Sequence, residues 1–355
     1  GSFFGYILHD YSGMVFFHVL FIVCNVVIVM GGIQGGIEKF CTVAMPALFF
    51  MLLFVIIYVA FQPGAGQGYK DMLTPNFEPI SSFSGFLEVL SKAAGQMFFS
   101  LSLGMGAIIS YGSYLDKKEN LQKNALIIPA CDTLIAVMAA CAVLPACAAF
   151  GMEYNQGPGL LFNTMQNVFL SMGSFGSFVG FMFYFLVFIA AVTSSISLFE
   201  AIVTWRIDAN REKGKTSNRT KIMCVAAVLS LIVGLPVALD AIGGGVTGVA
   251  GAVPAPYTFF GMSIDQLMAG EIPMFIDSWL DFFDVISEGI LMPLGALVMA
   301  LLIGWKWKTK DLIVPECEAS GHKFWGYGFF NFCFKFVTPI GMAIVLIGQI
   351  MDFFL

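Results

Sequence analysis

The chain has 355 residues, of which 58% are hydrophobic and only 11% are charged, and its formal net charge is −6. Charged residues make up about a quarter of a soluble domain, whereas apolar runs long enough to cross a bilayer recur along this whole sequence. The composition therefore excludes a soluble protein and predicts an all-α polytopic membrane protein.

Eight stretches are predicted to cross the membrane within one transmembrane domain, 1–355: 14–31, 43–61, 86–115, 125–149, 175–205, 221–239, 279–305 and 326–354. Nearly all basic residues fall on one side, with only Lys70 and Lys92 on the other, so the positive-inside rule assigns the first side to the cytoplasm. We expect a multi-pass protein of the cell membrane whose two ends lie outside. Because the chain starts with Gly1 and transporters more often begin in the cytoplasm, we expect preceding spans to be missing.

Pro46 stands early in the second span. A proline removes one backbone donor and clashes with the preceding turn, so the cytoplasmic end of this helix is expected to unwind easily. An ordinary proline kink is the alternative.

The third span, 86–115, is predicted to be broken. The stretch from Gly95 to Ala107 carries two hydroxyls and two glycines in the seven residues 100–106. A helix in lipid must satisfy its own backbone, so a break at mid-depth is tolerated only where it lines a cavity, and transporters use such breaks as binding sites. The alternative is a kinked span with small residues at a helix contact.

Three loops on the outer side differ in character. Residues 62–85 form a polar, Gly/Pro-rich loop, and residues 150–174 contain an amphipathic piece that could dip into an outer vestibule. The long insertion 240–278 has no clear period and receives no role.

Two groups of polar residues lie inside later spans. Asp132 is a carboxylate at membrane depth, which is costly unless paired, so a bound cation is its natural counter-charge; a structural acid near an interface is the alternative. Thr193 and Ser194 could join backbone carbonyls in an all-oxygen shell for a monovalent cation. Hydroxyls in membrane helices usually bond the carbonyl one turn back, which is the alternative here.

Acidic residues lie near both ends of the spans. Glu200 and Asp208 are eight residues apart and share a helix face, so with Tyr114 they could form a polar network that closes the inner mouth. Asp281 and Asp284, at the start of the seventh span, could bind a basic partner; the alternative is that both are solvated acids at the interface.

Together these residues resemble the neurotransmitter:sodium symporter family, particularly its bacterial amino-acid transporters. Gly95–Ala107 looks like the family's unwound sixth helix, and Thr193-Ser194-Ser195 looks like the sodium-binding run of its eighth. Gly36 and Pro46 resemble its fifth-helix Gly-x9-Pro motif, Asp284 stands where it keeps an outer gate acid, and 332–342 resembles its eleventh helix. The resemblance covers nearly all of the chain apart from 62–85 and 240–278.

The resemblance implies an inverted-repeat transporter fold with discontinuous helices, truncated so that it runs from the fourth helix to the eleventh. The first three helices, which hold half of the binding site, would be absent. We therefore expect the chain alone not to transport.

The resemblance also implies a role for each matching residue. The substrate would be bound by residues of the broken helix and the eighth helix: Phe99 as an aromatic lid, with Ser100, Ser102, Met105, Ser194 and Leu198. Sodium would be bound at a first site by Ser100 and Asp132, and at a second by the carbonyl of Ala190 with Thr193 and Ser194. Gating would involve Gln96 and Asp284 outside, Tyr114, Glu200 and Asp208 inside, and Gly36 with Pro46, which would let water reach the second sodium.

One departure bears on chloride. Chloride-dependent members need a small hydroxyl one turn beyond Asp132, and here that position is Ala136. The carboxylate of Asp132 would supply the negative charge itself, so we predict chloride independence, with proton return through Asp132 as a further possibility.

The expected function is sodium-coupled symport of a small, apolar or aromatic amino acid by alternating access. The expected partners are the amino acid, sodium ions as co-substrate and the lipid bilayer, with no other cofactor and no nucleic acid; the oligomeric state stays open. No enzyme is expected, because His9, His18 and His322 lie away from the polar sites. A proton-coupled transporter of the same architecture, an ion channel and a transport-dead sensor or scaffold are the alternatives.

Overall fold

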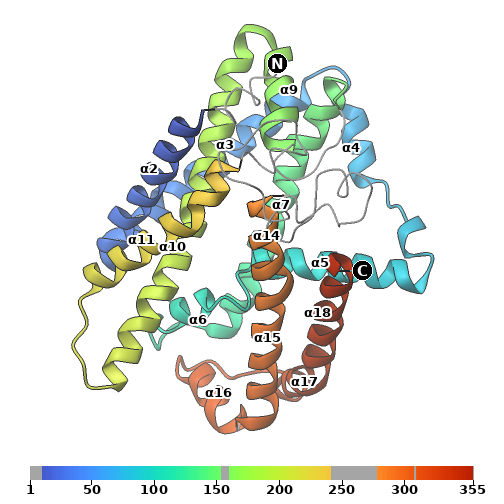
Figure 1. Ribbon diagram of the computed structural model, residues 1–355. Coiled ribbons are helices and arrows are strands. Elements are labelled where there is room, and N and C mark those ends of the chain that lie inside the picture. Colours follow the sequence, from blue (N-terminus) through green and yellow to red (C-terminus); the bar gives the residue numbers. More distant parts are fainter. Residues whose placement is uncertain (1–9, 153–159, 241–277, 308, 355) are drawn as a thin grey trace. The chain divides into compact units, whose positions relative to one another are not determined.

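The computed structural model of the chain describes residues 10–152, 160–240, 278–307 and 309–354. Every regular element within these ranges is helical (Figure 1). This confirms the all-α prediction. The apolar composition explains the helices, because a helix satisfies its own backbone N–H and C=O groups where no water is present. The insertion 240–278, apart from its two end residues, lies outside the described ranges, so its role is not addressed.

The chain divides into two compact units. The first unit combines Gly1–Asn76 with Thr133–Ala238, and the second combines Phe77–Asp132 with Leu239–Leu355. The helix α7 (Leu121–Ala149) begins in the second unit and ends in the first.

In the first unit the long helix α10 is the element against which the others pack. It contacts α2, α3 and α9, and its side chains at Val179 and Phe183 are buried together with Val55 of α3 and Met165 of α9. The elements of this unit are α2 (Tyr11–Met30), η1 (Ile33–Glu38), α3 (Lys39–Ala60), α4 (Ala65–Leu73), the end of α7, η3 (Leu160–Thr164), α9 (Met165–Ser171), η4 (Gly173–Phe175), α10 (Gly176–Glu212) and α11 (Arg219–Leu239).

In the second unit α18 packs against α15 and α5 (Figure 1). The centre of this contact is a small apolar core of Phe98, Met292, Met342 and Val345. The elements are η2 (Glu78–Ile80), α5 (Phe83–Ser100), α6 (Ala107–Gly112), the start of α7, α14 (Trp279–Asp284), η6 (Val285–Leu291), α15 (Met292–Leu301), η7 (Leu302–Lys306), α16 (Thr309–Glu318), α17 (Tyr327–Phe332), η8 (Cys333–Val337) and α18 (Thr338–Phe354).

Seven helical segments of the described chain are long and apolar enough to cross a membrane. They are Tyr11–Met30, Ile33–Ala60, Leu121–Ala149, Gly173–Glu212, Arg219–Leu239, Trp279–Lys306 and Tyr327–Ile350. The sequence predicted eight spans, and the difference is the third, 86–115. That stretch is divided between α5 and α6, so no single long helix fills it.

The loops predicted to lie on the outer side are partly helical. The loop 62–85 contains α4 and η2, and the loop 150–174 contains η3 and α9. Helix α2 begins at a capped position, where Asp10 accepts a hydrogen bond of 2.9 Å from the backbone N–H of Gly13. This bond, together with the Ser12 hydroxyl, lowers the pKa of Asp10.

Glycine allows α4 to lie directly on the end of α7. A Cβ added to Gly68 would lie 2.5 Å from the Pro145 Cα and 2.7 Å from the Leu144 carbonyl oxygen, and both are backbone atoms that cannot turn aside. Gly66, two residues earlier in the same helix, has open space around it. The two glycines therefore differ in packing, although they share a helix.

Replacement of each glycine by alanine tests this packing. Gly68→Ala should destabilise the protein by roughly 1–3 kcal/mol, because the added methyl forces α4 away from α7. Gly66→Ala should be neutral or stabilise by up to about 1 kcal/mol, because alanine is the better helix former. Thermal unfolding in one detergent measures both, and equal effects of the two changes would contradict the packing.

Candidate functional site

The third span leaves helical geometry between α5 and α6, at residues 101–106. Ser102 has a φ of +52°, and among the described residues it is the only one other than glycine that has a positive φ. Gly104 and Gly106 follow with φ values of +79° and +82°. Such positions favour glycine because it lacks a Cβ, so the two glycines explain where the helix breaks.

The break packs against the start of α15. A side chain at Gly104 would collide with the backbone carbonyl of Met292, and a Cβ on Gly295 would lie 2.9 Å from the Gly104 carbonyl oxygen. The irregular backbone is therefore held by protein contacts along this side, as expected of a break in a membrane helix.

A hydroxyl and a carboxylate meet at the beginning of the break. The Oγ of Ser100, the last residue of α5, lies 2.7 and 2.8 Å from the two carboxylate oxygens of Asp132 in α7. Within the described ranges, ion pairs join Glu88 to Lys92 and Glu200 to Arg219, and none reaches Asp132. The two residues predicted to form the first sodium site are thus brought together, with a carboxylate that has no protein cation beside it in these ranges.

The other predicted substrate residues of this unit lie in the break or within one turn of it along the chain. The Phe99 side chain is exposed, at 55% of its full area, while the neighbouring Phe98 is buried in the core. Ser102 and Met105 are half-buried in the irregular segment, and Gln96 is exposed one turn before the break. These positions leave Phe99 and Gln96 available to a ligand.

The predicted second sodium site lies in the first unit, on α10. The Thr193 hydroxyl donates to the Ala190 carbonyl over 2.9 Å, so two of the three expected oxygens are adjacent. This bond is also the one-turn-back bond of the alternative interpretation. Ser194 and Leu198 are exposed on the same helix.

Glu200 of α10 has a partner that the sequence analysis missed. Its carboxylate is fully buried and pairs with the Arg219 guanidinium, whose Nη1 lies 3.1 Å from Oε1. The Arg219 Nη2 also donates to the carbonyl of Val29 at 3.1 Å, and the Thr204 hydroxyl lies 3.2 Å from Glu200. Arg219 is the first residue of α11 and one of several basic residues between the end of α10 and the start of α11, so no signal in the sequence distinguishes it.

Asp208 and Tyr114, the other residues predicted to form the inner polar network, are both exposed. Asp208 is exposed two turns beyond Glu200, so the shared helix face does not bring it into contact with Arg219. Tyr114 is exposed in the second unit, just after α6. Gly36 lies in η1, where a side chain would collide with the Ile28 carbonyl, and Pro46 lies inside α3. The stretch from Gly36 to Pro46 is therefore wound in this structure.

Asp281 and Asp284, which are predicted to lie on the outer side, differ in their contacts. Asp281 is the third residue of α14, and its backbone N–H and carboxylate both bond the Ser278 hydroxyl at the start of the helix. Asp240 accepts a hydrogen bond of 2.6 Å from the Trp279 N–H. Asp281 and Asp240 thus form hydrogen bonds with groups at the start of α14, whereas Asp284, the predicted gate acid, is exposed.

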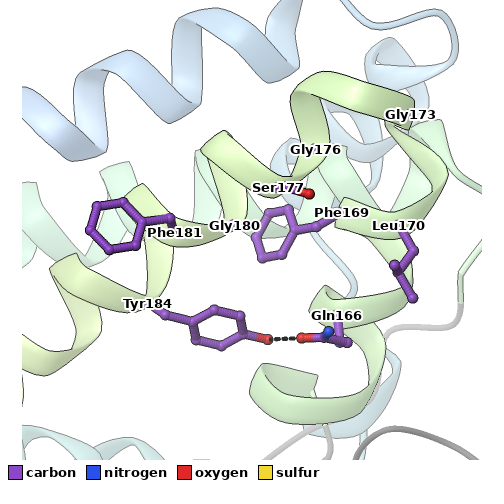
Figure 2. Close-up of a pocket in the computed structure, with 9 residues that line it drawn as sticks. All are labelled: Gln166, Phe169, Leu170, Gly173, Gly176, Ser177, Gly180, Phe181 and Tyr184. Atoms are coloured by element: carbon purple, nitrogen blue, oxygen red, sulfur yellow. Dashed lines mark hydrogen bonds between the residues drawn. The ribbon is translucent and has the colours of Figure 1, made fainter.

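A hollow of about 270 Å³ lies over the start of α10 and is covered in part by α9 (Figure 2). The Tyr184 hydroxyl at its floor is 3.3 Å from the Gln166 amide oxygen and 2.9 Å from the Leu161 carbonyl. Its lining residues are Gln166, Phe169, Leu170, Gly173, Gly176, Ser177, Gly180, Phe181 and Tyr184. No residue predicted to bind substrate or sodium is among them.

Comparison with known proteins gives a consistent family. The model of the sodium:neurotransmitter symporter family matches residues 9–247. Over 337 residues the chain is 33% identical to an uncharacterized sodium-dependent transporter of Haemophilus influenzae, covering 95% of this chain and 65% of the relative. It is 30% identical over 337 residues to the uncharacterized sodium-dependent transporter YhdH of Bacillus subtilis, covering 94% and 66%.

The fold has a solved counterpart. The crystal structure of MhsT in complex with L-phenylalanine matches with a TM-score of 0.75 and 28% identity, over 98% of this chain and 71% of that one. This match confirms the predicted fold class of a transporter with discontinuous helices. The chain spans about two thirds of the length of the curated relatives it matches.

These relatives are named as transporters, in agreement with the expectation that the chain is not an enzyme. The membrane helices and the family model together make it a multi-pass membrane protein. The chain belongs to the sodium:neurotransmitter symporter family.

Proposed function

We propose that this chain takes part in sodium-coupled symport of a small amino acid with an apolar or aromatic side chain, by alternating access. Sodium acts as the co-substrate, and no covalent chemistry and no other cofactor are involved. The observation that carries this proposal is the contact between Ser100 and Asp132 at the broken helix, with distances of 2.7 and 2.8 Å.

The chemistry of this contact favours a monovalent cation. A carboxylate in a membrane protein needs a counter-charge, and a carboxylate with a hydroxyl supplies only hard oxygen ligands. Backbone carbonyls of an interrupted helix add further oxygens in transporters of this kind. We therefore assign Ser100 and Asp132 to the first sodium site, and Ala190, Thr193 and Ser194 to the second.

The substrate class follows from the side chains beside the break. Phe99 and Met105 offer apolar surface, and Ser102 offers a small hydroxyl; we also assign Ser194 and Leu198 to substrate binding. The matched MhsT structure is a complex with L-phenylalanine, which supports an apolar or aromatic amino acid.

Alternating access needs gates at both ends. We assign the outer gate to Gln96 and Asp284, and the inner gate to Tyr114, Glu200 and Asp208. Glu200 ties α10 to α11 through Arg219, and Arg219 ties both to the last turn of α2 through the Val29 carbonyl. The segment from Gly36 to Pro46 follows a few residues beyond that last turn of α2, so unwinding it would open a water path from inside.

Sodium dependence is tested by uptake into proteoliposomes that carry the whole transporter. Labelled amino acids should accumulate under a sodium gradient and not under a potassium gradient. Thr193→Ala should lower the apparent affinity for sodium in uptake by roughly ten-fold or more. Loss of even a residue that only supports a metal ligand typically lowers metal affinity or activity by about 10–100-fold.

Ser197→Ala is the matched control, because the Ser197 hydroxyl bonds the Thr193 carbonyl on the same helix and is not assigned to sodium. Uptake that is equal in sodium and potassium would overturn the proposal and favour the proton-coupled alternative. Absence of any uptake by a folded protein would favour a sensor or scaffold.

Chloride should have no effect. Replacing chloride by gluconate should leave uptake unchanged, because Asp132 already supplies a fixed negative charge and Ala136 offers no hydroxyl. The double change Asp132→Asn with Ala136→Ser should make uptake depend on chloride, and Asp132→Asn alone should lower uptake in either salt. Loss of uptake in gluconate for the unchanged protein would show the assignment to be wrong.

The Glu200–Arg219 pair should be important for stability. Arg219→Ala leaves a fully buried carboxylate without its partner, so it should lower the free energy of unfolding by roughly 3–5 kcal/mol. Arg211→Ala removes an exposed arginine at the end of α10 and should change stability little. Thermal unfolding of the two variants in one detergent measures both effects. Similar shifts of the unfolding temperature in the two variants would contradict a stabilising buried ion pair.

A further inference from the structure

Tryptophan and lysine alternate where the span Trp279–Lys306 ends, as Trp305, Lys306 and Trp307. Trp305 and Trp307 expose 64% and 47% of their area. Tryptophan prefers the boundary between lipid tails and headgroups, and lysine beside a membrane attracts anionic headgroups. By the positive-inside rule this boundary is the cytoplasmic one.

The fold brings a second basic segment to the same place. Gly304 of η7 lies against η8 so closely that a Cβ would be 3.2 Å from the Lys335 Cα. The Trp305 indole N–H donates to the Lys335 carbonyl over 3.0 Å, and its ring packs edge-on against Phe336 with centroids 5.9 Å apart. The indole is thus fixed against the backbone at Lys335, and this brings Lys335 close to the segment that carries Lys306.

A third lysine is held at the same end of the unit. The Thr309 hydroxyl lies 3.3 Å from the Asn331 side-chain oxygen, and this contact joins the first turn of α16 to α17 (Figure 1). Lys310 is the next residue and is exposed. We refer to Trp305, Lys306, Lys310, Phe332, Lys335 and Phe336 together as the η7–η8 surface.

The charges of this surface are not neutralised by ion pairs within the part of the chain that the structure describes, because the two pairs found there involve Lys92 and Arg219. Two of the acids of α16 are at its far end, where Glu318 accepts a hydrogen bond of 3.1 Å from the Phe324 N–H. Asp311 in the first turn is the one acid beside Lys310. The surface therefore keeps a positive excess.

Apolar surface continues directly from these charges. Phe332 and Phe336 are exposed at 54% and 45%, with ring centroids 5.7 Å apart. A soluble anion would bind the lysines without contacting the aromatic rings. A zwitterionic lipid would pack against the rings but would have little electrostatic attraction to the lysines. A ligand that matches both has a negative headgroup and an acyl chain.

We propose that the η7–η8 surface is a binding site for an anionic phospholipid, whose phosphate headgroup lies at Lys306, Lys310 and Lys335 and whose acyl chain lies along Phe332 and Phe336. The site is independent of the transport function proposed above. It ties the ends of two membrane helices to the cytoplasmic leaflet.

The test is quenching of tryptophan fluorescence by brominated lipids in the whole chain. Trp205, Trp279 and Trp325 are changed to phenylalanine, so that the emission comes from Trp305 and Trp307. Brominated phosphatidylglycerol should quench this emission at several-fold lower mole fraction than brominated phosphatidylcholine. Lys306→Gln and Lys335→Gln should each reduce the preference by roughly five-fold, because one lysine near an anionic surface contributes about that factor.

Matched controls separate this site from general attraction. Lys117→Gln with Lys118→Gln removes two exposed lysines of another loop in the same unit and should leave the preference unchanged, and Lys306→Arg should retain it. The preference should also fall in roughly 1 M salt, where the Debye length is about 3 Å.

Three results would overturn the proposal. They are equal quenching by the two lipids, an equal loss of preference in the Lys117/Lys118 control, and displacement of the lipid by inorganic phosphate at equal concentration, which would indicate a site for a free anion. If circular dichroism shows that a glutamine variant does not fold, a second measurement on the unchanged chain replaces it. The unfolding temperature is compared in phosphatidylcholine with and without phosphatidylglycerol. The anionic lipid should raise this temperature, and no rise would refute the site.

Discussion

The need to satisfy every backbone polar group inside a bilayer governs this structure. It makes all regular elements of the described chain helical, and it restricts where a helix can stop. The stop at 101–106 requires left-handed backbone at Ser102 and at two glycines, and backbone strain at a residue such as Ser102 persists only where neighbours enforce it. Here the neighbour is the Met292 carbonyl at the start of α15, against which Gly104 packs. The break and its support form one feature.

The same constraint separates the two principal carboxylates. Glu200 is fully buried, and the fold supplies its counter-charge from Arg219. Asp132 accepts only the neutral Ser100 hydroxyl among the contacts described. A hydroxyl stabilises a carboxylate but does not neutralise it, so the remaining charge favours a cation from solution. The two acids thus differ in their counter-charge: Glu200 has one within the fold, whereas among the described residues Asp132 has a neutral hydroxyl as its side-chain partner.

Much of this arrangement was predictable from sequence. Long apolar runs predict the helices, and the Ser/Gly pattern of 100–106 predicts the break, because both are local properties of the chain. The pairing of Glu200 with Arg219 was not predictable, since it joins two helices across a turn and many basic residues occupy that loop. Asp281 was grouped with Asp284, but the Ser278 hydroxyl fixes it at the start of α14; the pattern of acids alone does not distinguish a residue that serves a helix end from a gate residue. The π-helical turns of η7 and η8 could not be predicted either, because an apolar sequence does not distinguish a π-helical turn from an α-helical one.

The two proposed sodium sites differ in what they require when empty. In α10 the Thr193 hydroxyl donates its hydrogen to the Ala190 carbonyl, so both oxygens are satisfied without an ion and the empty site costs little. Sodium must turn that hydroxyl away to use both oxygens, which offsets part of its binding energy. At the first site the Ser100 hydroxyl bonds Asp132, but within the described ranges no cationic side chain pairs with that carboxylate. Sodium at the first proposed site would therefore add a counter-charge, whereas sodium at the second would replace a hydrogen bond between two neutral groups.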